Sequence, residues 1–168
     1  MKTLRTYLWH FLQALALFAV ISFAVDRWRA PVQPDWPTAQ PLQTLAQQSV
    51  SLDEISRRQT AVLYFWGSWC GICRYTSPDV EKLHQAGIPV LGVALRSGSD
   101  ADVAAYMRQH GLTFPNVNDA DGNLSRQWQI AVTPTVVLLK NGRMVHHTTG
   151  FGSYWGLRLR IWLADAFA

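Results

Sequence analysis

The chain has 168 residues and a formal net charge of +4, and 49% of its residues are hydrophobic. A chain this apolar can bury a core, which excludes global disorder. Its Lys and Arg residues are scattered and form no basic run, which argues against a nucleic-acid-binding protein. The length fits one domain with residues to spare for a leader.

The N-terminal segment predicts a membrane anchor. Residues 8–25 are almost entirely apolar, and Tyr7, Trp9 and Trp28 bracket them. Eighteen helical residues span about 27 Å, close to the roughly 30 Å of a bilayer core. Aromatic residues gather at the two membrane interfaces. We therefore expect a cytoplasmic tail at 1–7 and a transmembrane signal anchor at 8–25.

Two other interpretations of this segment remain open. One is a cleaved signal peptide with a small-residue site at Ser22–Ala24, and the other is a buried soluble helix. Basic residues stand on both sides of the apolar run, so the positive-inside rule does not decide its orientation. A short tail before a long domain favours a domain outside the cytoplasm. We expect a single-pass protein of the bacterial inner membrane with its domain in the periplasm.

A proline-rich linker is expected at 26–41, followed by a domain at 42–168. The spaced prolines make the linker stiff and extended, which would hold the domain off the membrane surface. Residues 42–50 give one short strand at best. Ser51 and Glu54 stand three residues apart, a spacing typical of the first turn of a short helix.

A buried strand followed by two cysteines is the centre of the sequence. Residues 61–66 form a continuous apolar run, as in a strand buried on both faces. Cys70 and Cys73 follow with two residues between them, and a helical pattern runs on to Gly87. The N-terminus of a helix favours a thiolate over a thiol. This arrangement predicts a redox pair.

Metal binding by the cysteine pair is the competing hypothesis. Structural zinc sites usually have four protein ligands, and the sequence has no second Cys-x-x-Cys. His146 and His147 are adjacent on a predicted strand, so they point to opposite faces. We therefore expect no metal and no cofactor beyond a redox-active disulfide between Cys70 and Cys73.

The remaining elements alternate between strands and helices. Pro78 should kink the first long helix. Asn141-Gly142 is a hairpin signal between two strands, and Trp155, Leu159 and Trp162 share one face of the last helix. The expected segments are strands at 88–95, 135–139 and 143–149, an extended piece at 112–115, a turn at 119–122, and helices at 100–110, 123–128 and 154–164.

These residues resemble the thioredoxin superfamily. Its motif is Trp-Cys-x-x-Cys with a proline five residues later, here Trp69, Cys70, Cys73 and Pro78. A cis-proline loop is matched by Val132–Thr135. The resemblance implies an α/β thioredoxin fold with a central mixed sheet flanked by helices. The segment around 119–124 is similar to the TlpA/ResA branch of membrane-tethered extracytoplasmic thioredoxins, and the overall pattern to the D proteins of suppressor-of-copper-sensitivity operons.

The resemblance also assigns roles. Cys70 would be the nucleophile and Cys73 the resolving cysteine. Thr133 and the cis Pro134 would bind the substrate's extended segment, and Trp69 would be exposed beside them. The sequence leaves open whether Trp66 joins this rim or the core. The middle residues Gly71 and Ile72 should tune the reduction potential in a direction that the sequence does not give.

The sequence departs from the family at two positions. Tyr64 replaces a buried acid of thioredoxin, and Thr76 replaces a Glu that is frequent in the TlpA/ResA branch. Asp79 and Glu81 follow Pro78 and are expected at the surface. The sequence therefore offers no proton acceptor for Cys73.

The leading hypothesis is a membrane-tethered thiol–disulfide oxidoreductase that acts as a reductase. Its partners would be extracytoplasmic protein thiols and disulfides, a membrane electron donor, and lipid through residues 8–25, but no nucleic acid. The resemblance suggests a link to copper tolerance or cytochrome maturation. Alternatives are an oxidant that donates its disulfide, a Cu(I) chaperone using both cysteines as soft ligands, and a structural tether with a vestigial fold.

Overall fold

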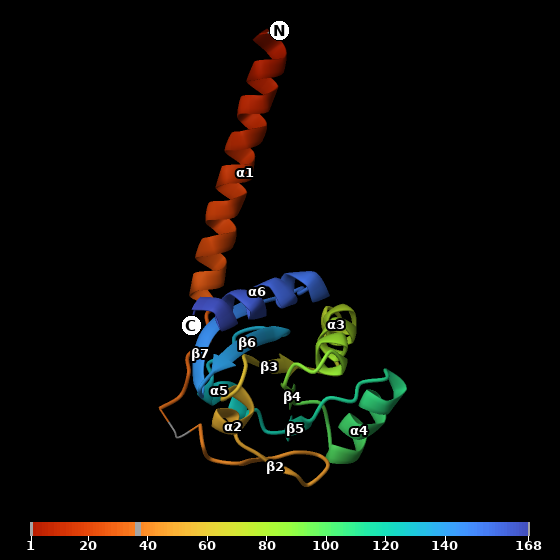
Figure 1. Ribbon diagram of the computed structural model, residues 1–168. Helices are drawn as coiled ribbons and strands as arrows, with labels where there is room; N and C mark the ends of the chain where they lie inside the picture. The colour runs from red at the N-terminus through yellow and green to blue at the C-terminus, as the bar shows by residue number, and fades with distance from the viewer. Residues whose placement is uncertain (1, 36–37, 168) are drawn as a thin grey trace.

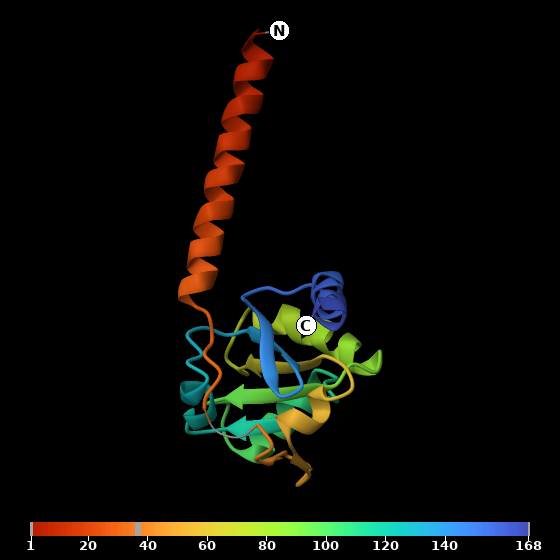
Figure 2. The ribbon, with the colours of Figure 1, turned by 60° about the vertical axis from the view of Figure 1, so that its left-hand side comes forward.

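A computed structural model of the protein describes residues 2–35 and 38–167. A long helix, α1 (Lys2–Trp28), projects from an α/β domain (Figure 1). Helix α1 also stands clear of the domain when the molecule is turned (Figure 2). The predicted helix at 8–25 is therefore part of a longer helix that begins in the expected tail.

A mixed sheet forms the centre of the domain. Within the described residues it has five strands in the order β5-β4-β3-β6-β7, with β3, β4 and β5 parallel and β6 and β7 antiparallel to their neighbours. The strands are β3 (Ala61–Trp66), β4 (Val90–Leu95), β5 (Asn116–Asp119), β6 (Thr135–Lys140) and β7 (Arg143–Thr149). This arrangement confirms the predicted α/β class with a central mixed sheet.

Helices cover both faces of the sheet. They are α2 (Leu52–Ser56), α3 (Cys73–Gln85), α4 (Asp100–Gln109), α5 (Asn123–Gln127) and α6 (Tyr154–Phe167). Side chains of β3 alternate between two cores. Val62, Tyr64 and Trp66 pack in the core that includes α3, α4 and α6, whereas Leu63 and Phe65 pack in the core that includes Leu52 of α2 and Trp128. The predicted central strand is thus buried on both faces.

The prediction missed one strand of the sheet. The sequence analysis placed an extended piece at 112–115, but β5 lies at Asn116–Asp119 and pairs in parallel with β4. Its residues are mostly polar, so they lack the apolar run that indicates a buried strand. A second small difference is the segment 42–50, which forms two short antiparallel strands, β1 (Leu42–Gln43) and β2 (Ser49–Val50).

Local turn and cap predictions are confirmed. Ser51 caps α2 by accepting a hydrogen bond from the Glu54 backbone N–H at 3.0 Å. Asn141 and Gly142 have φ angles of 51° and 71°, which suits the tight hairpin between β6 and β7. Gly87 follows the end of α3 with a φ of 82°, as a glycine after a helix should.

The linker differs from the prediction. Helix α1 continues through Trp28, so it includes the start of the predicted linker 26–41. Beyond it, the Val32 N–H donates to the Trp128 carbonyl at 3.0 Å. The Gln33 side chain donates to the Gly142 carbonyl and accepts from the Met144 N–H, both at 2.7 Å. These bonds hold the linker against the domain, so it is not a free spacer.

The predicted transmembrane span is not confirmed. In the part of the chain that the structure describes, no helix is both long and apolar enough to cross a membrane. Within residues 8–25, several side chains lie outside the described set, namely those of Leu8, Phe18, Ala19, Ser22 and Phe23.

Helix α6 packs on the sheet with a different face from the one that its tryptophans suggest. Leu157, Ile161 and Ala164 are its buried residues, and they contact β6, β7 and α3 through the adjoining core. Trp155 and Trp162 share a face as predicted, but that face is exposed. The apolar pattern of this helix therefore has two faces, of which the domain buries one.

Candidate active site

The two cysteines lie at the junction between the end of β3 and the start of α3. Cys70 and Cys73 form a disulfide with a Cα–Cα distance of 5.3 Å. Helix α3 begins at Cys73, whose backbone N–H lies 3.2 Å from the Cys70 Sγ atom. Such an N–H and the positive helix end stabilise a thiolate on Cys70. Cys70 is 6% exposed and Cys73 is fully buried, so an attacking group reaches Cys70 first.

The loop before β6 faces this disulfide. The Thr133–Pro134 peptide bond is cis, as predicted. The Thr133 carbonyl oxygen lies 3.5 Å from Cys70 Sγ. The loop is held from both sides, because the Thr135 hydroxyl donates to the Val132 carbonyl and the Gly150 N–H donates to the Pro134 carbonyl, each at 2.8 Å. The structure thus brings Cys70, Cys73, Thr133 and Pro134 together.

A second set of contacts fixes the turn that precedes Cys70. The Ser68 N–H donates to the Ser97 hydroxyl at 3.0 Å, and that hydroxyl donates to the Leu95 carbonyl at 3.1 Å. The Trp69 indole N–H also donates to Leu95, at 3.0 Å. A Cβ atom on Gly67 would lie 2.7 Å from the Trp69 ring, so any larger residue there would displace the indole from this position. Sequence reasoning missed Ser97, since an isolated serine after a strand carries no motif.

The tryptophans on either side of this turn have different roles. Trp66 is fully buried and its indole N–H donates to the Asn116 amide oxygen at 2.8 Å, so the open question about Trp66 is answered in favour of the core. Trp69 is exposed, as expected. Ile72 and Tyr75 are also exposed beside the cysteines. These three exposed side chains flank the cysteines in the sequence.

Three buried residues with hydroxyl groups, Tyr64, Thr76 and Ser77, lie on β3 and on α3, the helix that begins at Cys73. Tyr64, at the position of the family's acid, is buried and its hydroxyl lies 2.9 Å from the Ser77 hydroxyl. Burial raises the pKa of Tyr64 above its ordinary value, and the Ser77 hydrogen bond offsets only part of this rise. Thr76 is also buried, and its hydroxyl has no hydrogen-bond partner within the described part of the chain. Because its pKa is raised, the Tyr64 hydroxyl stays protonated near pH 7.

Glu81 was expected at the surface, and that expectation is wrong. Its side chain is only 5% exposed. The Thr113 and Phe114 N–H groups donate to Oε2 at 2.7 and 3.3 Å, and the Gln85 amide donates to Oε1 at 3.0 Å. Burial alone would raise the pKa of Glu81, but hydrogen bonds from Thr113 and its neighbours outweigh it, so the pKa lies below its ordinary value. This carboxylate fastens α3 to the segment before β5.

Asp79 is half-buried rather than fully exposed. It pairs with Lys82 at 2.7 Å and accepts from the Tyr154 N–H at 3.1 Å, which joins α3 to the start of α6. Among the residues that the structure describes, no group of three or more His, Cys, Asp or Glu side chains is arranged to hold a metal ion.

Comparison with known proteins assigns the family. Residues 34–148 match the model of the AhpC/TSA family. A protein of Haemophilus influenzae named Thioredoxin-like protein is 45% identical over 150 residues, which cover 89% of this chain and 90% of that protein. Thiol-disulfide oxidoreductase ResA of Oceanobacillus iheyensis is 26% identical over 142 residues, covering 79% of this chain and 73% of ResA.

Solved structures agree. The crystal structure of StoA from Bacillus subtilis superposes with a TM-score of 0.63 at 25% identity, over 71% of this chain and 92% of StoA. The central mixed sheet and its flanking helices are therefore those of a thioredoxin-like fold, as the sequence predicts.

Proposed function

We propose that this chain acts outside the cytoplasm as a reductase of other proteins' disulfides. It belongs to the AhpC/TSA family and is a thiol–disulfide oxidoreductase of the ResA, StoA and DsbE kind. The observation that carries the proposal is the placement of Cys70. It is the more exposed residue of the pair, and its sulfur receives the N–H of Cys73 at the start of α3. The cis-proline loop lies against the same sulfur.

The reaction proceeds by two exchanges. In the reduced protein, the Cys70 thiolate attacks one sulfur of a substrate disulfide, which forms a mixed disulfide and releases the other substrate sulfur as a thiolate. The Cys73 thiolate then attacks Cys70 Sγ, which breaks the mixed disulfide and releases the second substrate thiolate. Two electrons pass to the substrate, whose sulfurs each gain a proton, and the Cys70–Cys73 disulfide is formed.

Binding of the substrate uses the surface beside Cys70. The Thr133 backbone would pair with an extended substrate segment, and the exposed Trp69 would contact its side chains. Gly71 and Ile72 are both exposed, and we propose that they tune the potential of the pair. Return to the dithiol state needs a donor of two electrons, which we propose to be a membrane protein with its own dithiol.

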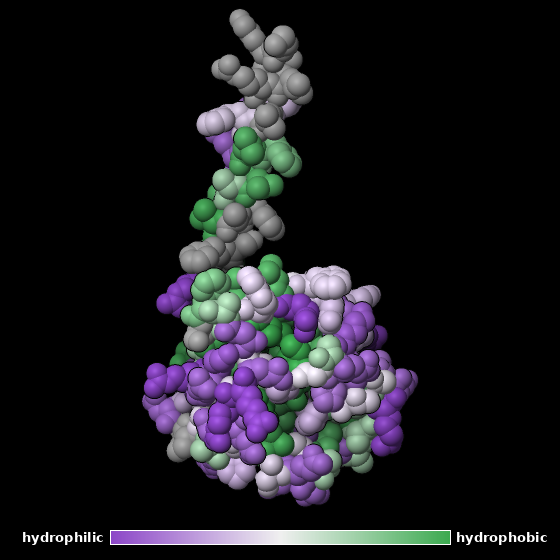
Figure 3. All heavy atoms as spheres, viewed as in Figure 1, coloured by the Kyte–Doolittle hydropathy of each residue, from purple (hydrophilic) through white to green (hydrophobic). Residues whose placement is uncertain are grey.

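Membrane attachment through α1 is the second part of the proposal. The helix exposes apolar side chains along its length, including Phe11, Leu15 and Val20, and Figure 3 shows this apolar surface above a more polar domain. We propose attachment to the bacterial inner membrane with the domain in the periplasm.

Two measurements test this placement. The chain should stay in the membrane fraction after alkaline washing, and protease added to spheroplasts should cleave the domain. Release by the wash would contradict it.

The reduction potential tests the direction of electron flow. The full chain in mild detergent would be equilibrated with glutathione buffers, and the dithiol fraction read after quenching with a thiol reagent. A potential near that of thioredoxin, about −270 mV, supports a reductase. A potential near about −120 mV would instead make the protein an oxidant that donates its disulfide.

A further inference from the structure

Helix α6 carries an apolar surface on its outer side. We use the name outer α6 face for Trp155, Leu159, Trp162, Leu163 and Phe167. Three of these are more than half exposed and aromatic, at 78% for Trp155, 62% for Trp162 and 82% for Phe167. Their spacing of three and four residues places them along one side of the helix. A helix on a water-exposed surface ordinarily turns a polar side outward. The apolar residues of the outer α6 face therefore indicate that another surface covers it.

The charges on α6 favour a partner surface that is both anionic and apolar. Arg158 and Arg160 lie on the same helix beside the outer α6 face, and both are exposed. The one acidic residue of this helix, Asp165, is exposed, but its carboxylate accepts from the Thr60 N–H and pairs with Lys140, both at 2.8 Å. Aromatic rings combined with arginines, with the one carboxylate paired to a lysine, are typical of a helix lying in a membrane interface, against anionic headgroups.

The position of α6 agrees with this partner. Helix α6 runs crosswise below α1 in Figure 1, and in Figure 2 it is seen nearly end-on, to the right of the foot of α1 but on the same upper side of the domain. The chain between the two helices is not free, because Val32 and Gln33 are bonded to the domain. The bonds of this segment therefore hold one side of the domain next to the end of α1, and α6 lies on that side.

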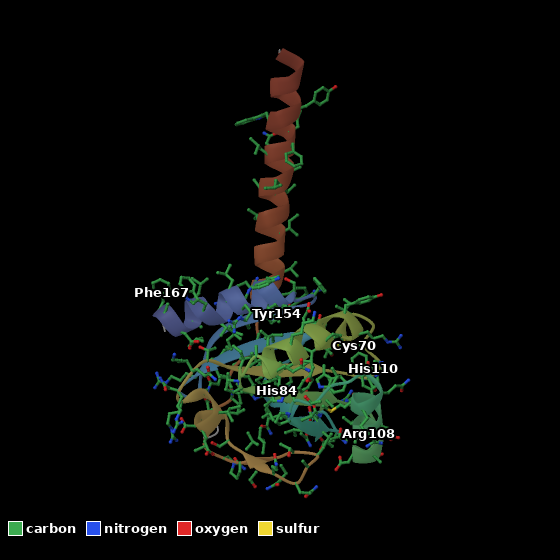
Figure 4. The ribbon with its side chains drawn as sticks, turned by 45° about the vertical axis from the view of Figure 1, so that its right-hand side comes forward. Cys70, His84, Arg108, His110, Tyr154 and Phe167 are labelled. Carbon is green, nitrogen blue, oxygen red and sulfur yellow. A yellow bond between two sulfur atoms is a disulfide. The ribbon has the colours of Figure 1, made fainter. Side chains whose placement is uncertain are left out.

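We propose that the outer α6 face lies flat on the lipid surface, with its aromatic rings among the headgroups and Arg158 and Arg160 at the phosphates. The inference rests on the proposed attachment through α1. It gives the domain a single orientation at the membrane. In Figure 4, α6 runs from Tyr154 to Phe167 at the foot of α1, while Cys70 lies elsewhere on the domain and stays open to partners.

A fluorescent label at three positions tests the proposal in the full chain. Cys70 and Cys73 are replaced by Ser, and one new cysteine is labelled with bimane in Leu159→Cys, Leu15→Cys or Arg108→Cys. Arg108 is exposed on α4, away from α6 (Figure 4). Each chain is reconstituted in phosphatidylethanolamine vesicles with about one quarter phosphatidylglycerol, an anionic surface. Lipids brominated near the headgroup quench from the membrane, and iodide quenches from water.

The proposal expects brominated lipid to quench position 159 by roughly half, since an interfacial helix buries its apolar face about 5–10 Å deep. Position 108 should respond to iodide alone. Replacing Arg158 by Glu in the chain labelled at 159 should weaken the lipid quenching. Cooperative thermal unfolding of each variant shows that it is folded.

The other outcomes separate the two proposals. Lipid quenching at position 15 but only iodide quenching at 159 would overturn the α6 inference and leave the attachment of α1 intact. Lipid quenching at 159 without quenching at 15 would support α6 contact and contradict attachment through α1. Protection of position 159 from both quenchers would mean that protein, from a second copy or a partner, covers the outer α6 face, and would overturn the lipid assignment.

Discussion

The sulfur of Cys70 lies 3.5 Å from the carbonyl oxygen of Thr133, the residue that precedes the cis Pro134. In the disulfide this sulfur carries no hydrogen, so the carbonyl is a neighbour and not a hydrogen-bond acceptor. Attack on Cys70 occurs beside a backbone that can pair with a peptide. Cys73 lies behind it, fully buried. This order in depth supports the proposal that Cys70 is the nucleophile and Cys73 the resolving cysteine.

Replacing Cys73 by Ser should trap partner proteins. The Cys70 thiolate still attacks a substrate disulfide, but no second thiolate remains to release the mixed disulfide. Non-reducing electrophoresis should show adducts that dithiothreitol dissolves. Cys70→Ser is the matched control and should give none, because Cys73 is buried. Adducts through Cys73 in that control would reverse the two assignments. Loss of Cu(I) without any adduct in Cys73→Ser would favour the chaperone alternative.

The two tryptophans near the turn should respond differently to replacement. Trp66→Phe removes a buried hydrogen bond to Asn116, so the free energy of unfolding should fall by about 1–3 kcal/mol. Its rate of insulin reduction should be close to that of the wild type. Trp69→Ala is at the surface and should change stability by only about 0.5 kcal/mol, while raising KM. Urea unfolding and steady-state kinetics on both variants measure this. A lost rate in Trp66→Phe at full stability would contradict the core role.

Tyr64 should not act as the proton acceptor. Its pKa is raised above the ordinary value of about 10, so the hydroxyl remains protonated at neutral pH. Tyr64→Phe should lower stability by about 1 kcal/mol through loss of the Ser77 contact. The pH dependence of mixed-disulfide release, measured by stopped-flow fluorescence, should keep its midpoint. A midpoint that moves in Tyr64→Phe would assign proton transfer to this residue after all.

Glu81 should contribute stability that depends on pH. Because its folded-state pKa is lowered, the contribution is fully present above the unfolded value of about 4.3 and is lost as pH falls through the lower folded value. Glu81→Gln should cost about 1–3 kcal/mol at pH 7. The difference from the wild type should shrink below about pH 4.

Urea unfolding at a series of pH values measures this difference. Glu54→Gln, the same change at an exposed position of α2, is the control and should stay within about 0.5 kcal/mol of the wild type. A cost for Glu81→Gln that is equal at every pH would mean that the carboxylate charge is not what stabilises the fold.

The strands were predictable where their residues are apolar. β3, β4, β6 and β7 were expected close to their observed bounds, since continuous or alternating apolar residues indicate strands directly. β5 was not, because Asn116–Asp119 becomes a strand only by pairing with β4. The cysteine pair and the cis proline were predicted from local motif and resemblance. Ser97 was not, since its contact with Ser68 joins two distant loops.

The cysteine pair and most of the secondary structure could be predicted from the sequence, because a Cys-x-x-Cys after an apolar strand and the period of apolar residues are local patterns. Which side chains are buried became clear only in the folded domain. Trp66 and Glu81 are inside and the outer α6 face is outside, although their residue types suggest otherwise or leave it open. The physical reason is that burial depends on which elements pack together. An acid can be buried where four backbone and side-chain donors meet it, and a helix with two apolar faces can bury only one of them in its own domain.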